Sequence, residues 1–277
     1  MFNYYKHEKY IFSILLVSVV IWSIFPIYMV LTSSFKVPVE IFGYPPTFFP
    51  NNLYIYNFIN LFNETPQFLK SLINSGIISF FTMLLTVIVC LPAAYTFSRN
   101  KSSFVKKSAI FIIAIRMFPP LIISVPLYPV LNKLNLTDKH IVLILLYTTF
   151  EITIITLIMK SFIDSIPIEI EEAARLDGAN ISAIFLYIIL PLSRPIIVTA
   201  TILVGSYAWN DFQFGFLFTS SEARTTPVLI AEMVGSLTGV QWGNVFAACV
   251  IQFLPPLVFL WFIQKYLIYG LTSGSIR

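Results

Sequence analysis

Three ionisable side chains lie inside long apolar stretches of this sequence, where an isolated charge is costly. Arg116 and Glu151 occur in two successive stretches. Asp211 follows Trp209 and Asn210 near the outer end of another stretch, at about 196–218. A charge at the centre of a bilayer costs about 2.5–3.5 kcal/mol on insertion scales, so these residues are candidates for lining a translocation pathway. A carboxylate and an amide beside an aromatic ring also suit the hydroxyl groups of a sugar.

Each of these residues also has a structural interpretation. Arg116 and Glu151 could pair with each other. Trp209 and Asp211 could belong to the belt of aromatic and polar residues at the membrane surface. The sequence leaves both interpretations open.

A second concentration of charged residues lies between the fourth and fifth apolar stretches. Acidic residues follow Pro167, which suits the first helical position, and Gly178 stands where such a helix would end. Asn180 or Ser182 could cap a second helix that runs to a break at Pro191. Two short helices joined by a glycine turn, with several apolar side chains, predict a docking surface for another protein. A solvated linker is the alternative.

No arrangement typical of an enzyme or a metal centre occurs in the sequence. None of the ten glycines is followed by lysine, so the chain has no phosphate-binding loop, and any ATP with its Mg²⁺ would bind to other subunits. Cys90 and Cys249 lie in apolar stretches and are expected to act as small hydrophobic residues, while the imidazoles are His7 and His140. We expect no intrinsic catalysis, no bound cofactor and no metal.

The composition excludes an ordinary soluble domain. Of the 277 residues, 57% are hydrophobic and 11% are charged, whereas soluble domains average about 25% charged residues. The mean hydropathy of +0.84 also indicates a bilayer as the solvent. The net charge of +4 is too small to indicate nucleic-acid binding, and it fits basic loops beside anionic lipid. We expect a multi-pass protein of the cell membrane.

Six apolar stretches are each long enough to cross a bilayer as one helix, which takes about 20 residues. They cover approximately residues 11–31, 72–97, 108–131, 139–159, 196–218 and 243–264. The first is too long for a typical signal-peptide core, and no small-residue cleavage site follows it, so we expect it to be retained. The sequence predicts an all-α membrane protein with six transmembrane helices in a single domain over residues 1–277.

The distribution of basic residues predicts that both termini face the cytoplasm. In that orientation, eleven Lys and Arg residues lie inside and five lie outside, as the positive-inside rule requires. The inner residues are Lys6, Lys9, Arg99, Lys101, Lys106, Lys107, Lys160, Arg175, Arg194, Lys265 and Arg277. The outer residues are Lys36, Lys70, Lys133, Lys139 and Arg224.

Prolines predict kinks in two of the six helices, because proline breaks the backbone hydrogen-bond ladder. These prolines are Pro119, Pro120, Pro126 and Pro129 in the third stretch and Pro255 and Pro256 in the sixth. Such kinks serve either packing or a lined pathway. Five further prolines at about 32–70 predict an extended, stiff outer loop.

The charged segment between the fourth and fifth stretches resembles a family motif. Glu172-Ala173-Ala174, then Gly178, then Ile188, Leu190 and Pro191 reproduce the spacing of the EAA loop, which marks the permease subunits of ABC importers. Other segments resemble the carbohydrate-uptake permeases of the maltose-transporter type, and the chain is similar to the shorter, six-span subunit of that type. These segments are Phe35-Lys36, Pro38, Glu40-Ile41-Phe42, Pro45-Pro46, Arg116-Met117-Phe118-Pro119, Pro126-Leu127-Tyr128 and Trp209-Asn210-Asp211-Phe212.

The resemblance implies import of a sugar or oligosaccharide that an extracytoplasmic binding protein delivers. It implies two cytoplasmic ATPase subunits, which would hold ATP and Mg²⁺, and a second, related permease. The loop at about 160–194 would couple the chain to the ATPases, and the outer segment 219–242 would reach the binding protein. The implied coupling residues are Glu172, Ala173, Ala174, Asp177, Gly178, Ile188, Leu190 and Pro191.

Other classes of membrane protein remain as alternatives. A secondary transporter or channel driven by an ion gradient could use Arg116, Glu151 and Asp211, but it would not need an EAA loop. An ABC importer of amino acids, phosphate or metals would share that loop. A membrane-embedded enzyme would show turnover in the isolated subunit.

Overall fold

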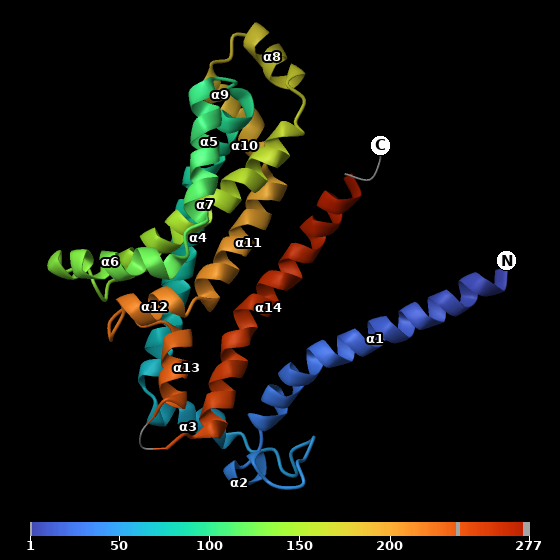
Figure 1. The fold of residues 1–277 in the computed structure, drawn as a ribbon, viewed down its shortest axis with the longest axis vertical. Coiled ribbons are helices and arrows are strands. Elements are labelled where there is room, and N and C mark those ends of the chain that lie inside the picture. The colour runs from blue at the N-terminus through green and yellow to red at the C-terminus, as the bar shows by residue number, and fades with distance from the viewer. Residues whose placement is uncertain (1, 237–238, 274–277) are drawn as a thin grey trace. The chain divides into compact units, whose positions relative to one another are not determined.

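The computed structural model describes residues 2–236 and 239–273, in which all regular structure is helical (Figure 1). The helices are α1 (Phe2–Ser33), α2 (Pro38–Ile41), α3 (Tyr56–Glu64), α4 (Gln67–Arg99), α5 (Ser103–Arg116), α6 (Pro120–Lys133), α7 (His140–Asp164), α8 (Glu169–Leu176), α9 (Ile181–Ile184), α10 (Leu190–Leu192), α11 (Arg194–Asn210), α12 (Gln213–Phe218), α13 (Thr226–Val234) and α14 (Trp242–Ser273), with a π-helical segment η1 (Phe185–Ile189) between α9 and α10. The predicted all-α class is confirmed.

Four helices are long and apolar enough to cross a membrane by themselves. They are α4, α7 and the segments Tyr10–Ser33 of α1 and Trp242–Trp261 of α14. These match the first, second, fourth and sixth predicted spans. A fifth candidate is the pair formed by Ile181–Leu192 and α11, which meet at an angle of 72°. Six crossings, with α5 and α6 together as the third, remain a prediction.

Proline explains why the third apolar stretch is two helices rather than one. Helix α5 ends at Arg116 and α6 begins at Pro120, a position where the missing N–H costs no hydrogen bond. Figure 1 shows α6 running across the direction of α5. In contrast, α14 continues as one helix through Pro255 and Pro256.

The chain forms two compact units. One unit consists of the chain up to Leu69 together with Leu229–Leu254, and the other contains Lys70–Val228 and the chain from Pro255 onward. The first unit has a small core of Leu61, Phe68, Leu229, Ala247 and Ala248. The single transmembrane domain over the whole chain therefore remains a prediction.

The first unit also contains the proline-rich segment after α1. Asn57 is buried and donates its Nδ2 hydrogens to the carbonyl oxygens of Ser34, at 2.9 Å, and Lys36, at 2.8 Å. Glu40 accepts hydrogen bonds from the Thr47 hydroxyl and the Asn51 backbone N–H. These contacts hold the segment in one shape, but α2, α3 and the contacts of Glu40 make it folded and partly helical rather than extended as predicted.

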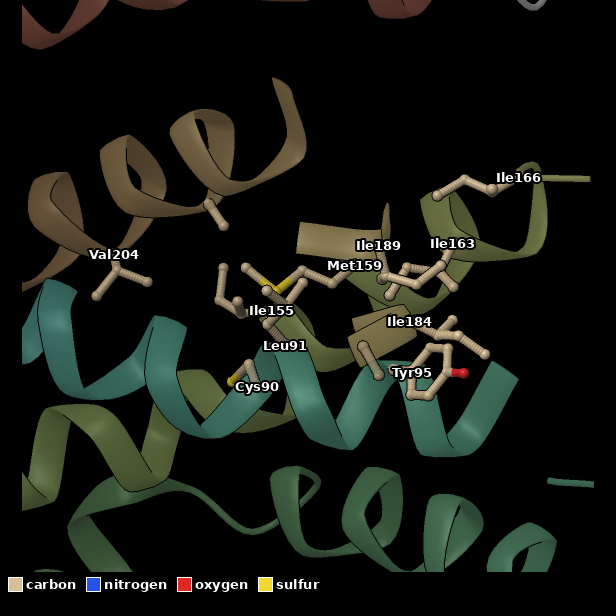
Figure 2. Packing of buried hydrophobic residues seen from close by; sticks show 12 residues of the cluster. Cys90, Leu91, Tyr95, Ile155, Met159, Ile163, Ile166, Ile184, Ile189 and Val204 are labelled. Carbon is tan, nitrogen blue, oxygen red and sulfur yellow. The ribbon is translucent and has the colours of Figure 1, made fainter. Parts of the chain in front are cut away.

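The larger unit has its main core where α4, α7, α11 and the short helices after α8 meet (Figure 2). Leu91 and Tyr95 of α4 lie beside Met159 and Ile163 of α7, and Ile184 and Ile189 close the cluster from the short helices. A second core contains Tyr147, Phe214 and Phe218. Gly205 permits close packing of α11, because a Cβ there would lie 2.6 Å from Met83 Sδ of α4. This packing fixes the short helices against the long ones.

Candidate functional site

The helix pair predicted after the fourth apolar stretch is present, and its turn depends on Gly178. The backbone φ of Gly178 is +89°, as predicted for a left-handed turn. The N–H of Gly178 bonds to the carbonyl of Arg175, and the N–H of Ala179 bonds to that of Ala174. These two bonds form a Schellman motif, which ends α8 and satisfies its last carbonyls.

The boundaries of the two short helices differ slightly from the prediction. Helix α8 begins at Glu169, two residues after Pro167. Asn180 caps α9, since its Oδ1 accepts from the N–H of Ala183 at 2.8 Å. The helical path then continues through η1 and past Pro191 to Leu192, so the break predicted at Pro191 lies two residues later.

The predicted EAA-loop residues divide into an exposed group and a packed group. Glu172, Ala173, Asp177 and Gly178 are exposed. Ala174, Ile188 and Leu190 pack against the main core of the larger unit, and Pro191 is half-buried. The packed residues therefore hold the helix pair in place, while the exposed ones are accessible to a partner.

Large apolar side chains are also exposed on the helix pair. Leu176 is 90% exposed, Tyr187 79% and Ile181 64%. Leu176 and Ile181 lie on either side of the turn at Gly178, and Tyr187 lies in η1. Their exposure supports the prediction of a docking surface over that of a solvated linker.

The sequence interpretation missed Glu171, the residue before the EAA triplet. Its side chain is fully buried, whereas that of Glu172 is exposed. Glu171 Oε1 accepts from Arg99 Nε at 2.6 Å, and Oε2 accepts from the Tyr95 hydroxyl at 2.8 Å. Helical spacing could have indicated this, because Glu171 lies one turn before Ala174 on the face of α8 that packs inward.

A cleft of about 770 Å³ lies beside this contact. Its walls come from the last turns of α4 and from α8, α9 and η1. Three basic residues line it, Arg99, Lys101 and Arg175, together with the apolar side chains of Ile181 and Phe185. The cleft therefore lies next to the helix pair and is lined by both basic and apolar side chains.

Arg116 and Glu151 lie together, as the structural interpretation predicted. Arg116 Nη1 is 3.8 Å from Glu151 Oε1 and donates to the carbonyl of Phe150 at 2.8 Å. Glu151 is buried, and Arg116 is half-buried. Each charge is therefore compensated within the protein.

Asp211 holds the break between α11 and α12. Its Oδ2 accepts from the Tyr147 hydroxyl at 2.9 Å and from the N–H groups of Phe214 at 3.0 Å and Gly215 at 3.3 Å. Asn210 is exposed and donates to a carbonyl of its own helix, and Trp209 is buried. The structure thus joins Asp211 to Tyr147 and to the start of α12 rather than to the side chain of Asn210.

A dense polar contact links the α6–α7 turn to the segment before α13. Asp138 accepts from the backbone N–H groups of Ser220, Ser221, Glu222 and Ala223 at 2.9–3.2 Å. Partial burial raises the pKa of Asp138, but these N–H donors, Glu222 first, outweigh it and hold the pKa well below its ordinary value. The sequence interpretation did not identify this residue.

The first turns of α4 complete this contact. Asn74 Nδ2 donates to the carbonyls of Glu222 at 2.8 Å and Arg224 at 3.0 Å, and its Oδ1 lies 2.8 Å from His140 Nε2. Lys70 pairs with the Glu222 carboxylate at 2.7 Å. Within the described residues, no group of three or more His, Cys, Asp or Glu residues could hold a metal.

Comparison with known proteins identifies the family. Residues 91–272 match the family of binding-protein-dependent transport system inner membrane components, a match that includes α7, the helix pair and α11. The chain belongs to this family. It is a membrane component of a transport system and not a catalytic subunit, and the resemblance seen in the EAA loop is confirmed.

Curated relatives of this permease cover most of its length. It is 32% identical to the sulfoquinovosyl glycerol transport system permease protein SmoH of Agrobacterium fabrum, over 96% of this chain and 91% of the relative. It is 33% identical to the melibiose/raffinose/stachyose import permease protein MelC of Bacillus subtilis, over 91% of each. For the trehalose/maltose transport system permease protein MalG of Thermococcus litoralis, identity is 33% over 85% of this chain and 87% of the relative.

The fold of the permease is also that of a solved transporter. A chain of a bacterial ABC transporter involved in import of the acidic polysaccharide alginate aligns with a TM-score of 0.80 and 21% identity, covering 94% of this chain and 96% of that one. A second structure of the bacterial alginate transporter, in complex with its pentasaccharide-bound periplasmic protein, aligns with a TM-score of 0.68 and 16% identity over 93% of each chain. These alignments establish the shared ABC permease fold.

Proposed function

We propose that this permease imports a sugar or oligosaccharide as one subunit of an ATP-driven ABC importer. The observation that carries the proposal is the exposed helix pair, whose Schellman turn at Gly178 presents the EAA residues and the bare side chain of Leu176. A polar turn ringed by apolar side chains fits a protein partner. The sugar class is supported by relatives whose names specify sulfoquinovosyl glycerol, melibiose and maltose.

The exposed residues of the helix pair would bind an ATPase subunit. Ala173 is small enough to let α8 approach a partner closely, and Glu172 and Asp177 offer charges at the same surface. Gly178 sets the angle between the two helices. The packed residues Ala174, Ile188, Leu190 and Pro191 would carry the resulting displacement into the transmembrane helices.

The other partners follow from the family. A binding protein would deliver the sugar at the outer face, a second, homologous permease would complete the pore, and two ATPase subunits would hold ATP and Mg²⁺ at the inner face. Membrane lipid would surround the exposed apolar faces of α1 and α14. Arg116, Glu151, Trp209, Asn210 and Asp211 are proposed to lie along the translocation pathway, with their internal contacts fixing its shape.

The proposed topology has six crossings with both termini inside. The third crossing would combine α5 and α6, and the fifth would combine α11 and α12. Cysteines placed at the exposed positions Ser102 and Ser182 should react with impermeant thiol reagents only from the cytoplasmic side, and one at Asn51 only from outside. Labelling of all three from one side would contradict this topology.

Reconstitution in proteoliposomes tests the function. With a second permease, the ATPase subunits and a loaded binding protein, uptake of the sugar should require ATP and should persist when ion gradients are collapsed by ionophores. A thermal-shift screen of the binding protein over a sugar panel would supply the ligand. Uptake driven by an ion gradient without ATP would instead establish a secondary transporter that uses the Arg116–Glu151 pair.

A further inference from the structure

We propose that Glu171 is a positioning residue that joins α8 to the end of α4, so that movement of α8 by an ATPase reaches the transmembrane helices. This inference rests on the proposed function and assigns a role that the EAA triplet itself does not have. Glu171 and Glu172 are adjacent, yet one is fully buried and the other exposed. We call the contact of Glu171 with Tyr95 and Arg99 of α4 the joint. Glu171 belongs to the joint, and Glu172 belongs to the proposed docking surface.

Both carboxylate oxygens of Glu171 are used in the joint. Arg99 Nε donates to Oε1 at 2.6 Å, and the Tyr95 hydroxyl donates to Oε2 at 2.8 Å. Tyr95 and Arg99 lie one turn apart on α4, so the carboxylate is held at two points along one helix. A charged hydrogen bond in a buried site depends strongly on geometry, and the joint therefore resists both sliding and rotation of α8.

Arg99 extends the joint to the chain that enters α8. Its Nη2 donates to the carbonyl of Ile166 at 2.9 Å, and its Nη1 donates to Ser98 Oγ at 3.3 Å. Ser98 Oγ in turn donates to Asp164 Oδ1, at the end of α7, at 2.6 Å. One guanidinium thus holds α8 and the α7–α8 turn against the last turn of α4.

The architecture of α8 suits movement as a unit. Its eight residues end in the Schellman turn at Gly178, so its terminal carbonyls need no outside partner. A helix this short has little stability of its own, and its direction must come from tertiary contacts. Ala174 supplies an apolar contact on the same face, but Glu171 supplies the directional one. A push on the exposed face would therefore be transmitted through Glu171 to the 33-residue α4.

The test separates transmission from simple stabilisation. The variants are Glu171→Leu, Arg99→Met and the double variant, with Glu169→Leu as the exposed control on the same helix. Arg99→Met leaves the fully buried Glu171 carboxylate with Arg175, 4.0 Å away, as its remaining basic partner, and Glu171→Leu leaves the part-buried Arg99 without that carboxylate, so each single variant should lower the melting temperature of the assembled transporter. The double variant replaces the pair by two apolar side chains of similar volume, which is often neutral for stability, so its melting temperature should recover.

The decisive measurement is sugar uptake per ATP hydrolysed in proteoliposomes. We expect a loss of about tenfold or more in the double variant, with ATPase binding and basal hydrolysis retained, because coupling free energies of this kind correspond to roughly 5–150-fold effects. Glu171→Gln, which keeps the shape and one acceptor, should lose less. Glu169→Leu should couple normally.

Recovery of both melting temperature and uptake per ATP in the double variant would overturn the inference, since Glu171 would then only compensate a buried charge. If only the single variants unfold, the test still holds, because the decisive comparison uses the double variant. Failure of the proposed function is distinguishable, because the unmodified transporter would then show no ATP-driven uptake at all.

Discussion

The two ends of α4 are held by different kinds of contact. At its first turns, Asn74 binds the backbone carbonyls of Glu222 and Arg224, and the hydroxyl of Ser75 accepts from the N–H of Thr226. At its last turns, Arg99 and Tyr95 bind the side chain of Glu171. The contacts at the first end hold the segment before α13, whereas those at the last end hold helix α8.

This difference shows how one rigid helix can serve two tasks. A loop whose backbone N–H groups are bonded at every residue from 220 to 223 is held in one shape. A helix held through one carboxylate keeps its internal hydrogen bonds and can be displaced without unfolding. We therefore expect changes at the first end to affect stability and changes at the second end to affect coupling.

The largest effect after loss of the turn itself is expected for Leu176→Glu on the exposed face of α8. If an ATPase covers this side chain, the new carboxylate becomes buried without a partner, and ATPase affinity should fall by about tenfold or more. The control is Leu134→Glu, at an exposed leucine in the α6–α7 turn. Co-purification and titration would measure the affinity of each variant for the ATPase. Equal affinities of Leu176→Glu and Leu134→Glu would show that no ATPase covers α8.

Asp138→Asn should lower stability and spare coupling. The amide oxygen can replace few of the hydrogen bonds that the carboxylate accepts, so the melting temperature should fall by a few degrees while uptake per ATP stays unchanged. Because the folded pKa of Asp138 is depressed, its contribution is present above the unfolded value of about 3.9 and is lost as pH falls toward the folded pKa.

The matching measurement is thermal unfolding of the unmodified protein and of the Asp138→Asn variant over a pH series. The difference in melting temperature should be constant near neutral pH and should shrink below about pH 4. A difference that grows as pH falls would contradict the assignment, and so would a loss of coupling without a loss of stability.

Asp211→Ala should reduce transport moderately, without the loss of ATPase affinity expected for Leu176→Glu. Removing the carboxylate leaves the Tyr147 hydroxyl and two N–H groups at the start of α12 without their partner. We expect reduced transport with assembly and basal hydrolysis largely retained. Tyr147→Phe removes only the hydroxyl and is the matched control. Normal uptake in Asp211→Ala would place the residue among interfacial anchors.

Much of this account was accessible from the sequence, because its signals are local. Four of the six predicted spans correspond to single membrane-capable helices, and Gly178 with Asn180 predicted a turn that the structure confirms. The EAA spacing directed attention to Glu172. Which of two adjacent glutamates points inward depends on how α8 packs against α4, and no local pattern in one sequence states that contact.

The remaining differences also arise from tertiary contacts. The break of the third stretch after Arg116 was expected only as a kink, although Pro119 and Pro120 lie next to each other. Asp138 carries no motif, since its partners are backbone N–H groups more than eighty residues away in sequence. Contacts between a side chain and distant backbone leave no trace in residue types at the distant positions.

The most direct test of the coupling site is substitution of Gly178. A Cβ at this position meets no atom within 4 Å, so any effect comes from the backbone φ of +89°, which side chains disfavour by about 1–2 kcal/mol. Gly76→Ala is the matched control, because a Cβ there also meets nothing but the residue lies within helix α4. The two alanine variants therefore share an unobstructed Cβ, and only the one at Gly178 forces a side chain into a left-handed backbone conformation.

The measurement is sugar uptake and ATPase stimulation by loaded binding protein, recorded together in proteoliposomes. We predict that Gly178→Asp, which adds a charge to the strained turn, abolishes uptake and leaves the ATPase unbound or unresponsive. Gly178→Ala should reduce both activities, and Gly76→Ala should behave as the unmodified protein. Full uptake and full stimulation in Gly178→Asp would contradict the assignment of the helix pair as the coupling site.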